Sequence, residues 1–134
     1  MKYVPDACAL IAFFDAEDGG PTVSDLILTP TARLSIHSIN MCEVFYHFLR
    51  TSGPHAANVI LQDVLSFGIA IPDETPPQLW KAAADLKARY KRLSLADAIG
   101  VAYAAAIDGT FVTADHKELE PLARDGVCKF FFFR

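Results

Sequence analysis

Four carboxylates occupy positions in the sequence from which they could act together in catalysis: Asp6, Glu43, Asp97 and Asp115. Asp6 follows the short apolar run 2–5, and Asp115 comes two residues after the run 110–113. If both runs are parallel strands, both acids lie at the end of the sheet where the strands finish, which is where open α/β sheets bind ligands. Glu43 and Asp97 fall early in predicted helices that begin at the same end. We therefore expect the four acids to meet.

The surroundings of two of these acids are apolar. Glu43 lies within the largely apolar run 39–46, and Asp97 begins a helix that continues with the apolar run 98–102. A carboxylate removed from water needs a positive partner, and no Lys or Arg lies within a turn of Glu43 or between Asp97 and Lys117. Hard oxygen ligands suit Mg²⁺ and Mn²⁺. A divalent cation is therefore a candidate partner.

Each acid also has a purely structural interpretation, as a helix cap. Asp6 is a natural N-cap for a helix from residue 7 to about 17. Three four-residue segments have the form of a capping box: 40–43, 94–97 and 115–118. Ser38 or Asn40 would cap the helix that carries Glu43. The sequence leaves capping and chemistry open for each acid taken singly.

The elements that must position these acids alternate between short apolar runs and longer helical ones, which predicts an α/β domain with a largely parallel sheet. The predicted strands are 2–5, 33–36, 68–72, 110–113 and 129–133. The predicted helices are 7–17, 21–28, 38–51, 55–66, 94–107 and 115–124, with a further amphipathic helix whose apolar stripe is Leu79, Ala83, Leu86, Tyr90 and Leu93. Four consecutive phenylalanines in the last strand predict a strand covered on both faces.

Composition limits the class of protein. A length of 134 residues predicts one domain, 1–134. A hydrophobic content of 52% excludes a disordered chain. The net charge of −4 confines any nucleic-acid binding to a local patch. Three widely spaced cysteines indicate free thiols in a reducing compartment. No targeting or membrane-spanning run is present, which predicts a cytoplasmic protein that does not bind a membrane.

With these residues in view, the sequence resembles the PIN-domain ribonucleases, and among them the VapC-type toxins of toxin–antitoxin pairs. The resemblance rests on Asp6 after the first strand, on Glu43 at a helix start, and on the segments 93–98 and 113–115. The four acidic motifs occur in the family's order and cover essentially the whole chain. One position departs from the family: Ala7 stands where a Ser or Thr often follows the first aspartate.

The resemblance implies a PIN-like fold, a five-stranded, mainly parallel sheet flanked by helices on both faces. It implies that Asp6, Glu43, Asp97 and Asp115 are the catalytic residues and hold one or two Mg²⁺ or Mn²⁺ ions. Thr113 takes a hydroxyl position that hydrogen-bonds near the metal site. Glu118 is a candidate outer ligand, and a solvated helix residue explains it more simply. The implied partners are an RNA substrate, a cognate antitoxin and a second copy of the chain in a homodimer.

Our hypothesis is a metal-dependent endoribonuclease that uses ion-activated water for in-line attack on the phosphodiester. The resemblance adds that the products carry a 5′-phosphate and a 3′-hydroxyl. The alternative is a non-catalytic PIN scaffold that binds RNA or a protein partner. A dehalogenase-like phosphohydrolase needs a second aspartate two residues after Asp6, where Cys8 stands. A phosphate-accepting receiver domain needs an adjacent acidic pair after the first strand and a lysine after a late strand, and neither is correctly placed.

The basic residues gather in one segment. Between residues 81 and 92, five Lys or Arg face one Asp, so the segment carries a charge of +4 in a protein of −4. Its members Lys87, Arg89, Lys91 and Arg92 are candidate RNA-binding residues. A solvated helix face explains the same pattern. The four histidines lack metal-binding spacing, and His116, beside Asp115, is the one that could touch substrate.

Overall fold

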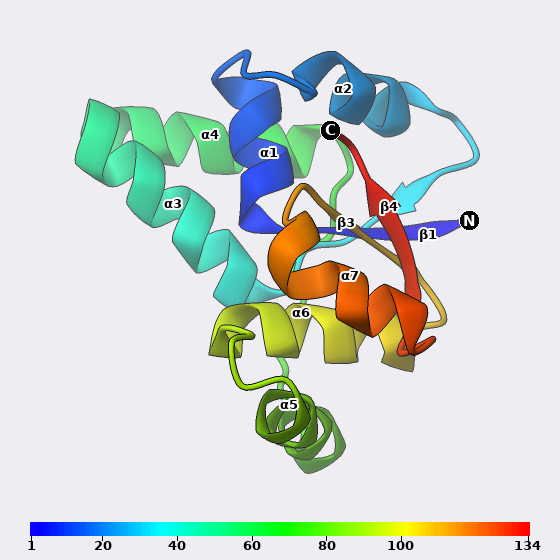
Figure 1. Ribbon diagram of the computed structural model, residues 1–134. Helices are drawn as coiled ribbons and strands as arrows, with labels where there is room; N and C mark the ends of the chain where they lie inside the picture. The colour runs from blue at the N-terminus through cyan, green and yellow to red at the C-terminus, as the bar shows by residue number, and fades with distance from the viewer.

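The computed structural model describes residues 1–134 and forms a parallel sheet between two layers of helices (Figure 1). The strands are β1 (Lys2–Pro5), β2 (Arg33–Leu34), β3 (Thr110–Thr113) and β4 (Lys129–Phe132). Their order in the sheet is β2-β1-β3-β4, and every pairing is parallel. The predicted α/β class, with helices on both faces, is confirmed.

The helices form the crossover connections that parallel strands require. They are α1 (Ala7–Phe14), α2 (Gly20–Leu28), α3 (Ser38–Ser52), α4 (Pro54–Ser66), α5 (Pro77–Arg89), α6 (Leu95–Ala106) and α7 (His116–Arg124). None of them has both the length and the apolar character of a membrane-spanning helix. Most predicted boundaries hold to within a few residues; α1 ends at Phe14 rather than near residue 17. The prediction that one helix carries the stripe as far as Leu93 is wrong, because α5 ends at Arg89 and leaves Tyr90 and Leu93 in the turn before α6.

Two cores hold the layers to the sheet. On one face, α5, α6 and α7 pack around Val4 and Phe111. On the other, α1 to α4 pack around Leu10, Leu34 and Val112. The predicted apolar stripe is present in the first core, where its members are buried or half-buried. Because α5 packs on α6 rather than on the sheet, it forms an outer layer.

Two strand predictions differ from the structure. The predicted fifth strand, 68–72, is reduced to one parallel bridge between Ser35 and Ala70, so the sheet has four strands. The predicted coverage of β4 on both faces is wrong, because only one face of this edge strand packs against the core. Phe130 and Phe132 pack against the α5–α7 core, whereas Phe131, on the opposite face, remains 36% exposed.

The chain topology brings the acids to one end of the sheet. We call the end where the strands finish the carboxyl end and the opposite one the amino end. Asp6 directly follows β1, and its N–H donates to the carbonyl of Val112 in β3 at 2.9 Å. Since α6 leads into β3 through the turn at residues 107–109, α6 begins at the carboxyl end. α7 begins there too, directly after β3.

Candidate active site

Asp6 is the most deeply buried of the four acids, with 5% of its surface exposed. It caps α1, because its Oδ1 accepts from the N–H of Ala9 at 2.8 Å. The pKa of Asp6 is raised from 3.8 to about 7, mainly by loss of hydration and to a smaller extent by the charges of Asp97 and Glu43. Hydrogen bonds from Thr113 and from the N–H of Ala9 oppose the rise. Capping occupies one carboxylate oxygen and leaves the other available.

The charge of Asp97 interacts with those of the other three acids. It occupies the first turn of α6, whose N-cap Ser94 accepts from the Asp97 N–H at 3.1 Å. Burial raises the pKa of Asp97, the hydrogen bond with Ser94 lowers it, and the charges of Asp115 and Glu118 raise it. Asp97 in turn raises the pKa values of Asp6 and Glu43. The four predicted acids therefore lie within electrostatic reach of one another, with Asp97 common to every pairing but one. We call these four residues the acid cluster.

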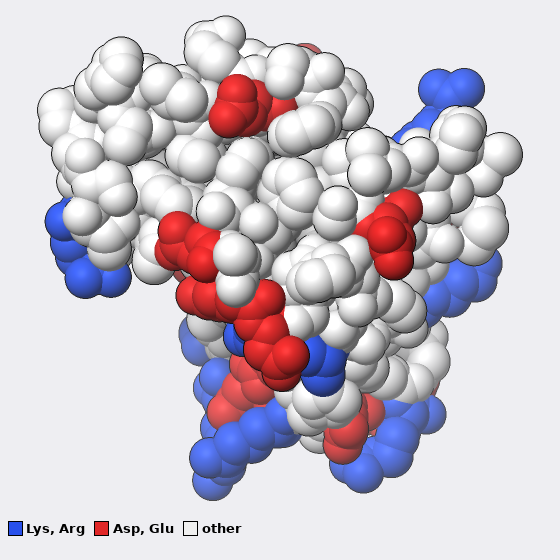
Figure 2. Space-filling view, turned by 90° about the horizontal axis from the view of Figure 1, so that it is seen from above, with Lys and Arg blue, Asp and Glu red and all other residues white.

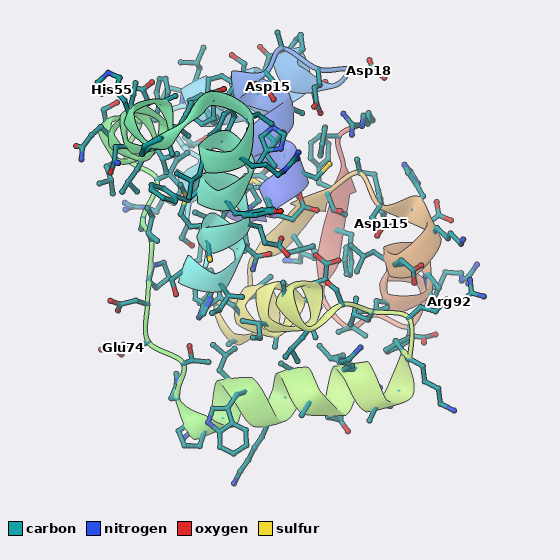
Figure 3. All side chains as sticks on the ribbon, turned by 90° about the vertical axis from the view of Figure 1, so that its left-hand side faces the viewer. Asp15, Asp18, His55, Glu74, Arg92 and Asp115 are labelled. Carbon is teal, nitrogen blue, oxygen red and sulfur yellow. The ribbon has the colours of Figure 1, made fainter.

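Glu43 and Asp115 are the outer members of the acid cluster. Glu43 lies in the second turn of α3 and is exposed as a residue, yet desolvation is still the main cause that raises its pKa. Asp115 is half-buried and caps α7, because its Oδ1 accepts from the N–H of Glu118 at 3.0 Å. Glu118, predicted as an outer candidate ligand, is half-buried near Asp97. Figure 3 looks onto this end of the molecule, with Asp115 beside α7.

The hydroxyl of Thr113 lies between two of the acids. Thr113 is fully buried at the end of β3. Its Oγ1 accepts from the Asp115 N–H at 3.1 Å, and it hydrogen-bonds the carboxylate of Asp6. A hydroxyl can donate one hydrogen bond while it accepts another. Thr113 thus ties the orientation of Asp6 to the backbone that carries Asp115.

No basic side chain neutralises the acid cluster. None of the ion pairs in the structure involves Asp6, Glu43, Asp97 or Asp115. Figure 2 shows acidic side chains across the middle of one face, with Lys and Arg along its lower margin. As they stand, the acids are not arranged as a ready metal-chelating group. Their shared repulsion and oxygen chemistry nevertheless fit a divalent cation, which would relieve the raised pKa values.

Asn40 is a buried residue beside the site whose role the sequence did not reveal. The prediction that Ser38 or Asn40 caps α3 is wrong: the cap is His37, whose Nδ1 accepts from the N–H of Ile39 at 3.2 Å. Asn40 is fully buried and donates to the carbonyl of Ala96 at 3.4 Å, while its Oδ1 has no partner. It thereby links α3, which carries Glu43, to the first turn of α6.

The predicted RNA-binding residues lie on α5 and on the turn that leads to α6. Arg89 lines a hollow with Ala102 and Ala105 of the second half of α6, toward the amino end of the sheet. Lys87 donates to the carbonyl of Leu93 at 2.8 Å, just before α6 begins. Arg89 pairs with Asp85 at 3.1 Å, with both side chains more than half exposed. Lys91 and Arg92 are exposed. In Figure 3, Arg92 lies on the same side of the view as Asp115.

His116 is held by its neighbours. Its Nδ1 contacts Glu120 Oε1 and its Nε2 contacts the carbonyl of Arg134, each at 2.7 Å. Its ring also stacks on Phe132. With both ring nitrogens occupied, His116 holds α7 to the segment after β4, which is a packing role.

A cavity of about 810 Å³ lies away from the acid cluster. Its lining includes Lys2 and Arg33 from the strand starts and Tyr103 and Ile107 from the second half of α6. These residues belong to the amino end of the sheet. The cavity contains no carboxylate, so the acid cluster remains the candidate site.

Comparison with known proteins agrees with this geometry. The family model of the PIN domain matches residues 3–124. No curated protein shows significant sequence similarity to the chain. Among solved structures, VapBC2 from Rickettsia felis, bound to a DNA fragment from its promoter, is similar with a TM-score of 0.76 and 19% identity over 98% of both chains.

Two further structures show the same fold. DNA-bound VapBC from Salmonella typhimurium has a TM-score of 0.75 and 16% identity, over 100% of this chain and 99% of the other. VapC20 from Mycobacterium tuberculosis, described as a sarcin–ricin-loop-cleaving toxin, has a TM-score of 0.66 and 16% identity, over 81% and 86%. The predicted resemblance to PIN-domain proteins of the VapC type is confirmed at the level of the fold. Because the family model spans nearly the whole chain, the protein belongs to the PIN domain family.

Proposed function

We propose that this protein is a metal-dependent endoribonuclease that hydrolyses RNA phosphodiester bonds. The observation that carries the proposal is the acid cluster at the carboxyl end of a PIN fold, where three carboxyl groups have raised pKa values and none forms an ion pair with a base. Folding that keeps uncompensated carboxylates together costs stability, and active sites are where such costs occur.

One or two Mg²⁺ or Mn²⁺ ions are the cofactor that this donor set fits. Asp6, Asp97 and Asp115 would hold the ion, with Glu43 completing the set. When bound, such an ion activates water and offsets negative charge on the phosphate. The chain's own residues orient the ligands: Ser94 fixes the first turn of α6 under Asp97, and Thr113 aligns Asp6 with Asp115.

We also propose that the protein is the toxin of a toxin–antitoxin pair, with RNA as substrate and a cognate antitoxin as partner. Support comes from the similar structures, which are VapBC complexes and a VapC toxin described as cleaving the sarcin–ricin loop. Exposed apolar side chains on the α3–α4 pair, among them Tyr46, Leu49 and Val59, provide a surface for the antitoxin or for a homodimer partner.

The test is RNA cleavage by purified protein with Mg²⁺, with Mn²⁺ and with a chelator, in parallel with Asp97→Asn. We expect cutting of single-stranded RNA that requires the metal and is lost in Asp97→Asn. The matched control is Asp108→Asn, the same change at the amino end, in an exposed residue with a backbone φ of 53° that asparagine also adopts. Equal cutting by wild type and Asp97→Asn, or cutting in excess chelator, would contradict the proposal. RNA binding without cutting would favour the non-catalytic scaffold.

A further inference from the structure

Arg134 reaches across the molecule to the first turn of α1. Its Nη2 lies 3.4 Å from the Sγ of Cys8, and its Nη1 donates to the carbonyl of Asp18 at 2.7 Å. Cys8 stands two residues after Asp6 and feels the charges of Asp6, Asp115 and Arg134 together. Arg134 therefore places a guanidinium beside the acid cluster, on the side of α1.

The position of Arg134 is fixed by packing on both sides. The preceding residue, Phe133, is buried at 4% exposure, and the guanidinium lies over its ring at 5.2 Å. Gly19 approaches so closely that an added Cβ would lie 2.6 Å from the Phe133 ring and 3.0 Å from the Cβ of Arg134. The carbonyl of Arg134 accepts from His116, the residue after Asp115. The guanidinium is thus held in place without being enclosed, since 31% of its side chain remains exposed.

The present partners of Arg134 leave part of its hydrogen-bonding capacity unused. A guanidinium has five N–H donors. Here one contact is to a carbonyl, one is to a thiol, which is a weak acceptor, and the carboxylate of Glu17 lies 3.6 Å away. A phosphodiester of RNA carries one negative charge and is a stronger acceptor, and its two non-bridging oxygens match the guanidinium fork. Arg134 therefore has donors to offer to a better acceptor.

Other basic residues lie on the opposite side of the acid cluster. Figure 3 shows Asp18, whose carbonyl Arg134 contacts, and Arg92 on either side of Asp115. Lys87 contacts the carbonyl of Leu93 on the same side as Arg92. A negatively charged chain that reaches the acids must cross a region of repulsion, and cations on both flanks would hold it there.

From this arrangement we propose that Arg134 binds a phosphate of the RNA strand on the α1 side of the acid cluster, opposite the basic turn that precedes α6. The inference rests on the proposed function, because it names the residue that positions the RNA strand for cleavage at that site. Arg134 is a positioning residue: the strand spans the acids between two cationic anchors, and the bond to be cut lies between them.

The experiment measures binding of a fluorescein-labelled single-stranded RNA by fluorescence anisotropy over a series of salt concentrations. All proteins carry Asp97→Asn to keep the RNA intact, and Arg134→Gln and Arg134→Lys are compared with the parent. The matched control is Arg33→Gln, which removes the same charge from an exposed arginine at the amino end. Cleavage kinetics of the same variants with Asp97 restored separate KM from kcat.

We expect Arg134→Gln to weaken RNA binding by about 3- to 10-fold and to lower the salt slope by about 0.7, the value for one lost phosphate contact on a single strand. KM should rise by the same factor with kcat within about twofold. Arg134→Lys should keep the slope, and Arg33→Gln should match the parent. Equal affinity and slope in Arg134→Gln and parent would overturn the proposal.

A purely structural role for Arg134 predicts a different pattern. Both substitutions would then loosen the contact with Asp18, lower the midpoint of thermal unfolding and leave the salt slope unchanged, which would also overturn the proposal. Failure of the proposed function gives a different result from failure of this inference. If the proposed function fails, the protein with Asp97 does not cleave RNA at all, whichever residue stands at position 134. Cleavage that is intact and insensitive to residue 134 would overturn this inference alone.

Discussion

The two ends of the sheet carry charge in opposite ways. At the amino end, Lys2, Arg33 and Lys129 begin three of the strands and are exposed. Lys129 approaches Asp108 at 3.9 Å, with side chains 71% and 93% exposed, so water screens the pair. At the carboxyl end, Asp6 is buried against β3, and its nearest charges are other carboxylates.

This difference shows which end of the molecule was shaped by something other than stability. An exposed ion pair contributes little to folding, and removing it costs little. Carboxylates that are buried near one another lower the stability of the folded state as soon as they ionise. The proposed cation would compensate these charges. The following predictions test that contrast between the two ends, from the largest expected effect to the smallest.

Asp6→Asn should abolish activity and stabilise the metal-free protein. The substitution keeps an oxygen to cap α1 but removes a charge that an ion would need. We expect RNA cleavage to fall by more than the roughly 10–100-fold that loss of an indirect metal contact costs. At pH 8 the free energy of unfolding should rise by up to about 4 kcal/mol, because a pKa raised from 3.8 to about 7 corresponds to a cost of that order once the group is ionised.

The direction of this effect with pH follows from proton binding. Between pH 3.8 and about 7 the folded protein holds a proton on Asp6 that the unfolded chain has lost, so wild-type stability falls as pH rises through that range. Asp6→Asn should remove this part of the decline in denaturant titrations from pH 4 to pH 8. The control Asp108→Asn should leave both the cleavage rate and the pH profile as in wild type. A steeper decline in Asp6→Asn would show that burial of Asp6 is stabilising.

Metal binding should strengthen with pH through the same range. Protons compete with the cation for Asp6, whose pKa is about 7. The affinity for Mn²⁺ should therefore rise by up to about tenfold per pH unit below pH 7 and level off above it. Isothermal titration of Mn²⁺ between pH 5.5 and 8.5 measures this. Asp6→Asn should bind more weakly and lose the steepest part of the dependence. An affinity independent of pH would mean that the cation does not displace the proton from the acid cluster.

Charge reversal on α5 and its turn should have a moderate effect on RNA binding. Arg89 is exposed at the end of α5 and Arg92 on the turn that precedes α6, so Arg89→Glu with Arg92→Glu should weaken binding by about tenfold and flatten its salt dependence. Arg33→Glu at the amino end is the control and should leave the slope unchanged. If both ends respond equally, RNA is attracted by overall charge rather than guided to the acid cluster.

Local rules predicted much of the site. The strands that precede Asp6 and Asp115 are short apolar runs bounded by good caps, and both acids do cap the helices that follow. Ser94 caps α6 as its position before an apolar helix predicts. Once the strands are parallel, the chain must bring these residues to one end of the sheet. The closeness of these acids is therefore a consequence of local patterns combined with the topology of the sheet.

Contacts between residues far apart in the sequence were not predictable. His37 displaces Ser38 as the cap of α3 because its other ring nitrogen contacts the carbonyl of Glu74 at 3.3 Å. The link between Asn40 and Ala96 likewise joins separate helices. Arg134 lies in no basic cluster of the sequence, and its place beside Cys8 follows only from the position of β4. Phe131 is more exposed than Phe130 and Phe132 because it lies on the other face of β4 from the core that buries them.

The smallest expected effect concerns Tyr103, which lies on the same helix as Asp97 but toward the amino end. Its hydroxyl is 3.0 Å from the Oγ of Ser35. Tyr103→Phe should lower the free energy of unfolding by about 1 kcal/mol, the usual contribution of a hydrogen bond, and Ser35→Ala should add little to it. Urea titrations of both single variants and the double variant measure this coupling.

Cleavage by Tyr103→Phe decides whether the two ends of the sheet are independent. α6 has Asp97 in its first turn and Tyr103 in its last, so a change in how the helix sits would move both. The core around Val101 and Ala104 is fully buried and holds α6 at several points besides Tyr103. We therefore expect a cleavage rate within about twofold of wild type. A larger loss would mean that α6 transmits changes along its length, and that the acid cluster depends on contacts at the amino end that its own charges do not reveal.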